Sequence, residues 1–418
     1  MTGPLADPRF RRLLAGQSLS SFGDTALYLM LGIWAKELTN SNSAAGGVFL
    51  ALGLPALFGP LTGHLADRVR RRPLLIGTNA AAGVVVLSLL AVHGRGQLWI
   101  IYAVAFAYGL ASGILSSAGA GLRKSLLGPE QTASANAMLQ TVSQGLRIVA
   151  PLVGTGMFVA FGGGSVAILD SVTFAAAIVA LLTIRLDEPR GHAVPAGSPG
   201  SSGSFFADVT AGFRHIRSVR LLFQITVVTA CGFTVIGLTE TAIFAVVDQG
   251  LHRSPAFFGV LNSTQGAASV LGGIAVSFML KRLGEARVVG LALAGFSVAS
   301  LLYTSHSVVL CLIGSVGDGL GLVWLVVGLS TAAQVHTPSF LQGRVNAAWS
   351  MVVLTPQTCS IAAGAWLIAV VDYRVLLLAI VVVMAVCAAT LLLKPAAAPA
   401  PAPESERQAP GIAAPSRL

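Results

Sequence analysis

Residues 63–73 read Gly63-His64-Leu65-Ala66-Asp67-Arg68-Val69-Arg70-Arg71-Arg72-Pro73, a short basic segment between two long apolar ones. The stretch 73–94 that follows carries no Asp, Glu, Lys or Arg. A helix of that length spans about 30 Å, which is the thickness of the hydrocarbon core of a bilayer. Residues 63–73, called the basic hinge below, are therefore predicted to form a short loop between two membrane-spanning helices.

The composition extends this prediction to the whole chain. Of its 418 residues, 55% are hydrophobic and 10% are charged, and the mean hydropathy of +0.80 is typical of an integral membrane protein. The pattern predicts an all-α polytopic membrane protein with about twelve transmembrane helices, near 11–36, 44–67, 73–94, 97–123, 131–160, 164–185, 218–248, 255–281, 286–304, 308–335, 342–370 and 374–393. The 47 glycines then indicate close helix packing rather than loops.

The basic residues predict the orientation of these helices. Of 26 Lys and Arg residues, 21 fall on one side, four on the other, and Arg147 lies inside a span. Because basic loops are retained in the cytoplasm, both termini are predicted to be cytoplasmic, with the chain in the inner (cytoplasmic) membrane. The net charge of +10 is explained by topology and attraction to anionic lipids, so no nucleic-acid partner is expected.

Two segments divide the chain. Residues 186–215 are rich in Gly, Ser and Pro, and residues from 394 onward are mostly Ala, Pro and Ser. Neither is expected to bury enough apolar surface to order itself. The predicted organisation is an N-terminal six-helix half (1–185), a cytoplasmic linker (186–215), a C-terminal six-helix half (216–394) and a disordered cytoplasmic tail (395–418).

An internal repeat supports the division. Gly63, Arg71-Arg72 and Asn136-Ala137 recur as Gly273, Lys281-Arg282 and Asn346-Ala347, always 210 residues later. Two halves related by a parallel repeat predict an alternating-access transporter with its substrate site near the midplane between them.

The motifs also resemble a known family. The basic hinge, with Gly63, Asp67, Arg68, Arg71 and Arg72, resembles the signature between helices two and three of the major facilitator superfamily. The stretches 16–24 (GQSLSSFGD), 38–41 (LTNS) and 53–55 (GLP) resemble the branch of macrolide-efflux and enterobactin-exporter-like proteins. This resemblance covers roughly residues 9–394 and implies the major facilitator fold, a small-molecule cargo and a monomer.

Two departures from the family pattern are visible. Arg70 stands where many members have Gly. In the segment 145–155, which resembles the antiporter signature of helix five, Ala150 and Thr155 occupy usual Gly positions. The resemblance therefore favours outward antiport without fixing it.

The basic hinge also has a physical interpretation of its own. Asp67 is expected at the end of a helix, where its carboxylate can pair with Arg68, Arg71 or Arg72. We interpret the hinge, from Gly63 to Arg72, as a gating loop whose disruption would bias the two halves toward another state. The alternative is that these arginines only set topology.

Ionisable residues inside spans are the next candidates because each is costly at the bilayer centre unless it faces partners or water. Asp24, Glu240 and Asp318 fall on predicted helices one, seven and ten, which line the central cavity in this fold, and Arg147 falls on helix five. We predict that these four residues couple proton movement to substrate or line its cavity. The alternative is that the acids pair with Arg147 or cap broken helices.

Other charged residues receive ordinary interpretations. Asp170-Ser171 is interpreted as a helix cap. Lys36-Glu37 and Asp372 with Arg374 are interpreted as interfacial charges at span ends. Four isolated cysteines indicate neither a disulfide framework nor a metal site.

No phosphate-binding loop or catalytic constellation occurs, so neither enzyme activity nor a cofactor is expected. The sequence predicts a secondary transporter that exports a small amphipathic compound by proton antiport, and the family resemblance implies a drug-, macrolide- or siderophore-like cargo. The alternatives are a lipid or nutrient transporter of the same fold, and a non-transporting membrane scaffold or receptor.

Overall fold

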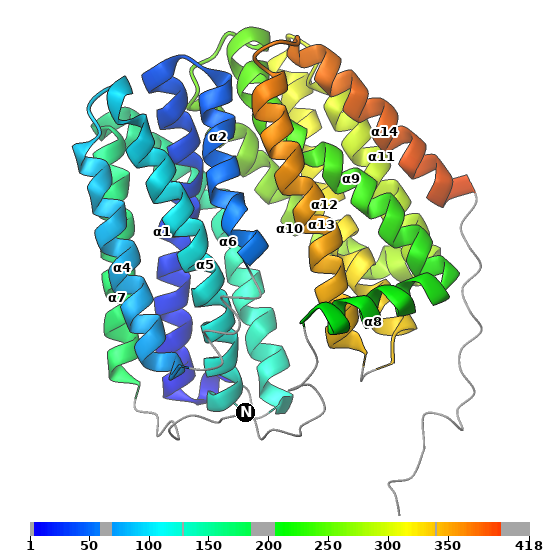
Figure 1. Ribbon diagram of the computed structural model, residues 1–418, viewed down its shortest axis with the longest axis horizontal. Helices are drawn as coiled ribbons and strands as arrows, with labels where there is room; N and C mark the ends of the chain where they lie inside the picture. Colours follow the sequence, from blue (N-terminus) through cyan, green and yellow to red (C-terminus); the bar gives the residue numbers. More distant parts are fainter. Residues whose placement is uncertain (1–3, 59–68, 128, 185–204, 339–340, 394–418) are drawn as a thin grey trace, which may run out of the picture.

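The computed structural model describes residues 4–58, 69–127, 129–184, 205–338 and 341–393. Within these ranges the chain is helical and the helices run up and down as one bundle (Figure 1). The elements of the first part are η1 (Pro4–Ala6), α1 (Pro8–Thr39), α2 (Asn42–Gly53), η2 (Leu54–Phe58), α4 (Arg71–Leu87), η3 (Ser88–Ala91), η4 (Arg95–Gln97), α5 (Leu98–Leu126), α6 (Pro129–Phe161) and α7 (Gly163–Thr183). Those of the second are α8 (Phe205–Ser218), α9 (Arg220–Ala245), the π-helical turn η5 (Val246–Gly250), α10 (Phe257–Leu283), α11 (Glu285–Leu302), α12 (Val308–His336), α13 (Gln342–Leu367) and α14 (Tyr373–Leu393).

The helices form two groups that stand side by side in Figure 1. Helix α1 packs on α6 and α7 in the first group, and α11 packs on α12 and α14 in the second. The two groups meet where α6 contacts α10 and where α2 contacts α9 and α13. We call the end of the bundle that carries the N-terminus the lower end and the opposite end the upper end.

The all-α polytopic fold is confirmed. Among the described residues, nine helices are long and apolar enough to cross a membrane. The other three predicted spans correspond to α1, α2 with η2, and α13, which are helical at the predicted places but fall outside that criterion. Polar residues lower the hydropathy of α1, which carries Gln17, three serines and Asp24 along its length.

The repeat noted in the sequence is matched by the helices. α5 and α12 are both 29 residues long, and they begin at Leu98 and Val308, which are 210 residues apart. The helices that carry Asn136 and Asn346, α6 and α13, each contain an internal proline, Pro151 and Pro356. The two groups are thus built on one plan.

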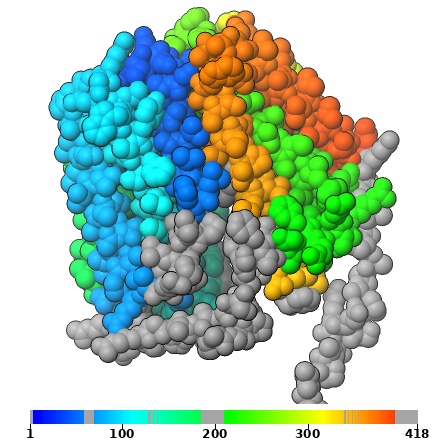
Figure 2. Space-filling view, in the orientation of Figure 1, coloured from blue at the N-terminus to red at the C-terminus, as the bar shows by residue number. Residues whose placement is uncertain are grey.

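Helix α8 corrects the expectation that residues 186–215 do not order themselves. It begins at Phe205, runs below α9 and packs against α13 and α9 (Figures 1 and 2). Ile216 is buried, Gly212 lies against the backbone of Arg344, and His215 Nε2 lies 3.1 Å from the carbonyl oxygen of His336. Residues 205–215 of the predicted linker thus form part of an amphipathic helix, which packs against the second group.

Close packing of α1 on α7 depends on Gly23. A Cβ placed there would overlap the side chains of Thr173 and Asp170. We expect Gly23→Ala to lower the thermal midpoint of the detergent-solubilised protein, since overpacking of this kind costs about 1–3 kcal/mol. Gly156→Ala is the matched control because a Cβ on Gly156 meets no atom within 4 Å. Equal midpoints for the two variants would contradict the packing argument.

Candidate functional site

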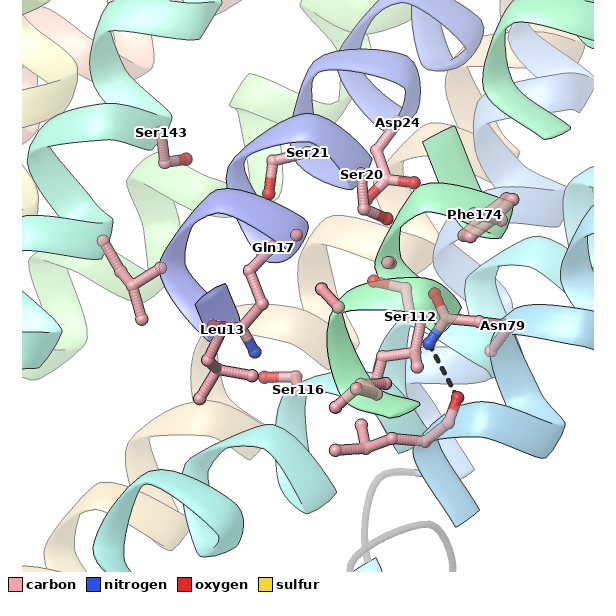
Figure 3. Close-up of a pocket in the computed structure, with 18 of the residues that line it drawn as sticks. Leu13, Gln17, Ser20, Ser21, Asp24, Asn79, Ser112, Ser116, Ser143 and Phe174 are labelled. Carbon is pink, nitrogen blue, oxygen red and sulfur yellow. Dashed lines mark hydrogen bonds between the residues drawn. The ribbon is translucent and has the colours of Figure 1, made fainter. Parts of the chain in front are cut away.

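A polar cavity of about 480 Å³ lies in the lower part of the first helix group (Figure 3). It extends from Leu13, near the lower end of α1, to Asp24, half-way up the same helix. We call it the N-half cavity. Its polar lining consists of Gln17, Ser20, Ser21, Asp24, Asn79, Tyr108, Ser112, Ser116, Arg123, Asn136, Gln140 and Ser143, contributed by α1, α4, α5 and α6.

Asp24 lies at the inner end of this cavity. The phenol of Tyr108, from α5, donates a hydrogen bond to its Oδ1 atom. The Asp24 side chain is only partly buried, whereas Tyr108 is 8% exposed and packs its ring edge-on against Phe174 of α7. The carboxylate is therefore held in place by a buried phenol and still faces the cavity.

Asp170 lies behind Asp24 and was misinterpreted from the sequence as a helix cap. The N-cap of α7 is Gly162, so Asp170 sits two turns inside the helix and is fully buried. Its Oδ1 atom accepts a hydrogen bond of 3.3 Å from Thr173, while Oδ2 has no partner within the described part of the chain. Its carboxyl interacts electrostatically with that of Asp24. The first group thus holds a pair of carboxyls.

A second, smaller cavity of about 80 Å³ lies in the other group and contains both remaining predicted acids. Asp318 of α12 is 8% exposed and accepts a hydrogen bond of 2.7 Å from Tyr303, which also lies 3.2 Å from Ser315. Glu240 of α9 is partly buried and lines the same space. The rest of this C-half cavity is formed by Ile236, Thr239, Ile243, Phe258, Leu261, Asn262, Gln265, Phe296, Ser300, Ile380 and Met384.

Arg147 links this acidic cavity to the first group. It lies on α6 where that helix crosses α10, with its backbone carbonyl against Gly266. Its guanidinium interacts electrostatically with Glu240, and Glu240 with Asp318. The four predicted intramembrane residues therefore separate into two sets: Glu240 lies within electrostatic range of both Arg147 and Asp318, whereas Asp24 is near Tyr108 and Asp170.

Aromatic rings pack between the two groups, above the N-half cavity and beside the C-half cavity, which Phe258 also lines. Phe49 of α2 lies 5.8 Å from Phe244 of α9, measured between ring centroids, and 5.2 Å from Tyr28 of α1. Phe244 also contacts Phe258 of α10 at 5.0 Å. Phe49 and Phe244 are each 1% exposed, so side chains from both groups fill the space between them.

An ion pair between a buried lysine and a half-exposed aspartate joins the groups at the upper end. Lys36, in the last turn of α1, is 3% exposed, and its Nζ lies 2.6 Å from Oδ2 of Asp248 in η5. Lys36 lies in the last turn of its predicted span, but its ion pair with the other group was not predicted. Because its partner is 212 residues away in the sequence, no local pattern identified the pair. We call the aromatic cluster and this ion pair the upper closure.

At the lower end, two hinge arginines bind helix C-termini. Arg71 donates to the carbonyl oxygen of Gly121 at 3.1 Å and to Ser125 at 2.8 Å, both at the end of α5. Arg72 donates to the carbonyl oxygens of Leu181 and Leu182, each at 2.9 Å, at the end of α7. These contacts complement the helix dipoles and tie α4 to its own group. Gly63, Asp67 and Arg68 lie outside the described residues.

Thr155, which stands at a usual Gly position of the antiporter signature, faces a glycine on the neighbouring helix. Its hydroxyl donates 2.7 Å to the carbonyl of Pro151 within α6, and its methyl-bearing side chain fits over Gly259 of α10. The small residue needed at this crossing is thus supplied by the partner helix.

In the described part of the chain, no group of three His, Cys, Asp or Glu residues is arranged to hold a metal ion.

The sequence matches the profile of the Major Facilitator Superfamily over residues 13–252 and again over 229–418. It is 24% identical to the uncharacterized MFS-type transporter YfmI of Bacillus subtilis, over 65% of this chain and 66% of that protein. It is 22% identical to macrolide efflux protein A of Streptococcus pyogenes, over 64% of this chain and 65% of that protein. The chain thus spans just under two thirds of the length of these two relatives. A third relative, the uncharacterized MFS-type transporter Mb0038c of Mycobacterium bovis, is 26% identical over 86% of this chain and 85% of its own.

Solved structures agree with the fold. A bacterial homologue of the iron transporter ferroportin, in an inward-facing state, superposes with a TM-score of 0.67 at 16% identity, covering 92% of this chain and 98% of that one. A POT family transporter in complex with 5-aminolevulinic acid gives a TM-score of 0.72 at 12% identity, covering 92% and 96%. These transporters are not enzymes, in keeping with the absence of a catalytic constellation from the sequence. The chain is a multi-pass membrane protein, and it belongs to the Major Facilitator Superfamily.

Proposed function

We propose that the protein exports a small amphipathic compound in exchange for protons, by alternating access of a site between its two helix groups. The observation that carries the proposal is the position of Asp24. It forms the inner end of a polar cavity in the lower part of the bundle, while the upper closure fills the space between the groups above it. A carboxyl that faces the cavity on one side of a closure can exchange protons and substrate with that side.

The proton role is supported by the placement of the acids. Asp24, Glu240 and Asp318 come from α1, α9 and α12, and each lines a cavity. Carboxylates in the membrane are expensive and occur where they face partners or water. Tyr108 and Tyr303 hold two of them in defined positions. Arg147, on α6 of the other group, supplies a positive charge in the neighbourhood of Glu240.

Outward transport is supported by the likeness to macrolide efflux protein A. The excess of Lys and Arg on one set of loops supports a cytoplasmic position for the lower end and both termini, with the chain in the inner membrane. The present conformation would then face the cytoplasm, like the inward-facing ferroportin homologue. We propose that residues 1–185 and 216–394 move as two bodies and that the basic hinge, including Gly63, Asp67 and Arg68, gates the lower end.

Everted membrane vesicles test this proposal. We expect macrolides, lipophilic cations or siderophores to be taken up when a proton gradient is imposed, and to discharge that gradient. Asp24→Asn and Glu240→Gln should each reduce this uptake by about tenfold or more, because the neutral amides retain shape but carry no proton.

Asp372→Asn is the control, since Asp372 is an exposed acid that accepts a hydrogen bond from the backbone of Arg374 at the upper end. Accumulation of a compound by intact cells would instead support import of a nutrient or lipid. Full activity of both neutral variants would contradict proton coupling through these acids.

A further inference from the structure

We infer that the N-half cavity recognises the hydroxylated, amine-bearing part of a substrate, so that the preferred cargo is a polyhydroxylated organic amine of the amino-sugar class. The inference rests on the proposed function, because it names the substrate of the same site. It is carried by the hydrogen-bonding groups that the cavity leaves unused and by the single acid at its inner end.

The serine hydroxyls of the cavity are unengaged. Serine and threonine in helices usually donate to a carbonyl three or four residues earlier, as Ser125, Thr25 and Ser330 do in this protein. Within the described part of the chain, the hydroxyls of the five cavity serines make no hydrogen bond; these are Ser20, Ser21, Ser112, Ser116 and Ser143. They come from three helices, α1, α5 and α6, and line one space (Figure 3).

Ser20 is the most deeply buried of the five cavity serines. It is 8% exposed, so nearly all of its surface is removed from solvent, and its hydroxyl has no protein partner. The hydroxyl oxygen itself is not among the fully buried polar atoms without a partner, so it opens onto the cavity, where a ligand or water can bind it. Asp24 lies one helical turn further along the same face of α1 (Figure 3). A ligand that reaches Asp24 therefore passes Ser20.

The charges of the cavity define the rest of the ligand. Tyr108 donates to Oδ1 of Asp24, which leaves Oδ2 to accept from a ligand ammonium. Arg123, the basic residue of the lining, donates to Asn136 at 2.9 Å and lies 3.4 Å from Gln17. Gln17 precedes Asp24 by seven residues, or about 10 Å along the helix, so Arg123 does not neutralise Asp24. The inner end of the cavity is acidic and the route to it is hydroxyl-rich.

The shape and apolar lining argue against a purely lipophilic cation. Tyr108 and Phe174 are the aromatic side chains among the lining residues, and Tyr108 is engaged with Asp24. Sites for lipophilic cations use several aromatic faces. The C-half cavity is lined by Phe258 and Phe296, but its volume of about 80 Å³ is too small for a drug-sized ligand. The N-half cavity, at about 480 Å³, is large enough.

Thermal unfolding of the purified full-length protein in detergent tests the inference without requiring transport. The probes are kanamycin as a hydroxylated amine, maltotriose as a neutral polyol and tetraphenylphosphonium as a lipophilic cation. We expect kanamycin to stabilise the wild-type protein at concentrations about tenfold lower than either of the others. The double variant Ser112→Ala/Ser116→Ala should weaken kanamycin by about tenfold, the loss expected for two hydrogen bonds, and leave tetraphenylphosphonium unchanged. Asp24→Asn should weaken both cations.

Ser330→Ala is the control, because Ser330 is exposed on α12 and donates to the carbonyl of Val326. Without ligand, each variant must unfold at the wild-type midpoint, so that a folding defect is not mistaken for lost binding. If the double variant unfolds at a lower temperature, the single Ser116→Ala variant replaces it. Tighter binding of tetraphenylphosphonium than of kanamycin, or kanamycin binding that is unaffected by the serine changes, would overturn the inference. Kanamycin binding without proton-driven export would refute the proposed antiport but support the inferred substrate class. Proton-driven export of lipophilic cations alone would support the antiport but refute the substrate class.

Discussion

Asp248→Asn is expected to open the upper end of the transporter. The change leaves the ammonium of Lys36, which is 3% exposed, without its anionic partner. Removing one member of a buried ion pair costs about 3–5 kcal/mol; because Asp248 itself is 43% exposed, we expect about 2 kcal/mol here. That amount shifts the balance between closed and open forms by roughly 30-fold. Lys36→Met, which removes the buried charge instead, should have a smaller effect.

Cysteine labelling measures this shift. After replacement of the four native cysteines, Ser21→Cys places a thiol in the N-half cavity. A membrane-impermeant maleimide applied from the upper side should label it at least tenfold faster in Asp248→Asn than in the parent protein. The charge exchange Lys36→Asp/Asp248→Lys should restore slow labelling. Asp372→Asn, at the same end but paired within its own group, is the control. Equal labelling rates in all variants would rule out a closing role for the pair.

Asp170→Asn is expected to uncouple transport from protons while leaving the fold intact. Asn has nearly the shape of Asp, and Thr173 can still donate to its side-chain oxygen. The change removes an ionisable group that interacts with Asp24. Because two carboxyls that share a buried site do not readily ionise together, protonation of Asp170 and of Asp24 is linked. We therefore expect proton-driven export to fall by about tenfold or more.

Proton-driven export is compared with the exchange of labelled for unlabelled substrate across proteoliposome membranes, measured at equal pH on both sides. This exchange needs binding and alternation but no net proton movement, so Asp170→Asn should retain most of it. Thr173→Val, which removes the hydrogen bond but keeps the carboxyl, should affect both activities only mildly. Loss of exchange together with export would show that Asp170 is structural, and retention of both would show that it has no part in coupling.

Most of the fold was predictable because membrane helices are set by local composition. The apolar stretches 97–123 and 308–335 became α5 (Leu98–Leu126) and α12 (Val308–His336), since nothing but a helix can satisfy the backbone in hydrocarbon. Helix α8 was missed because the Gly- and Ser-rich residues before it dominate the composition, and its stability comes from packing on α13 rather than from length.

The site was predicted only in part, for a related reason. Asp24, Glu240 and Asp318 are conspicuous because a charge inside an apolar run is locally visible. Their partners are not: Tyr108 follows Asp24 by 84 residues, and Asp248 follows Lys36 by 212. Asp170 was misinterpreted because it lies near the predicted start of its helix (164–185), where a polar residue commonly acts as a cap. Nothing in the sequence identified Tyr108 as a site residue except its position in the predicted span 97–123, which lines the central cavity in this fold.

The two acid–phenol pairs have a consequence for symmetry. Tyr108 and Asp318 are 210 residues apart, and each is the eleventh residue of its helix, α5 or α12. The same repeat position thus supplies the phenol in one half and the acid in the other, while the complementary members, Asp24 and Tyr303, come from α1 and the end of α11. The duplicated scaffold therefore presents two non-equivalent acids to whatever passes between them, and the order in which they are loaded is set by local chemistry and not by the twofold relationship of the halves.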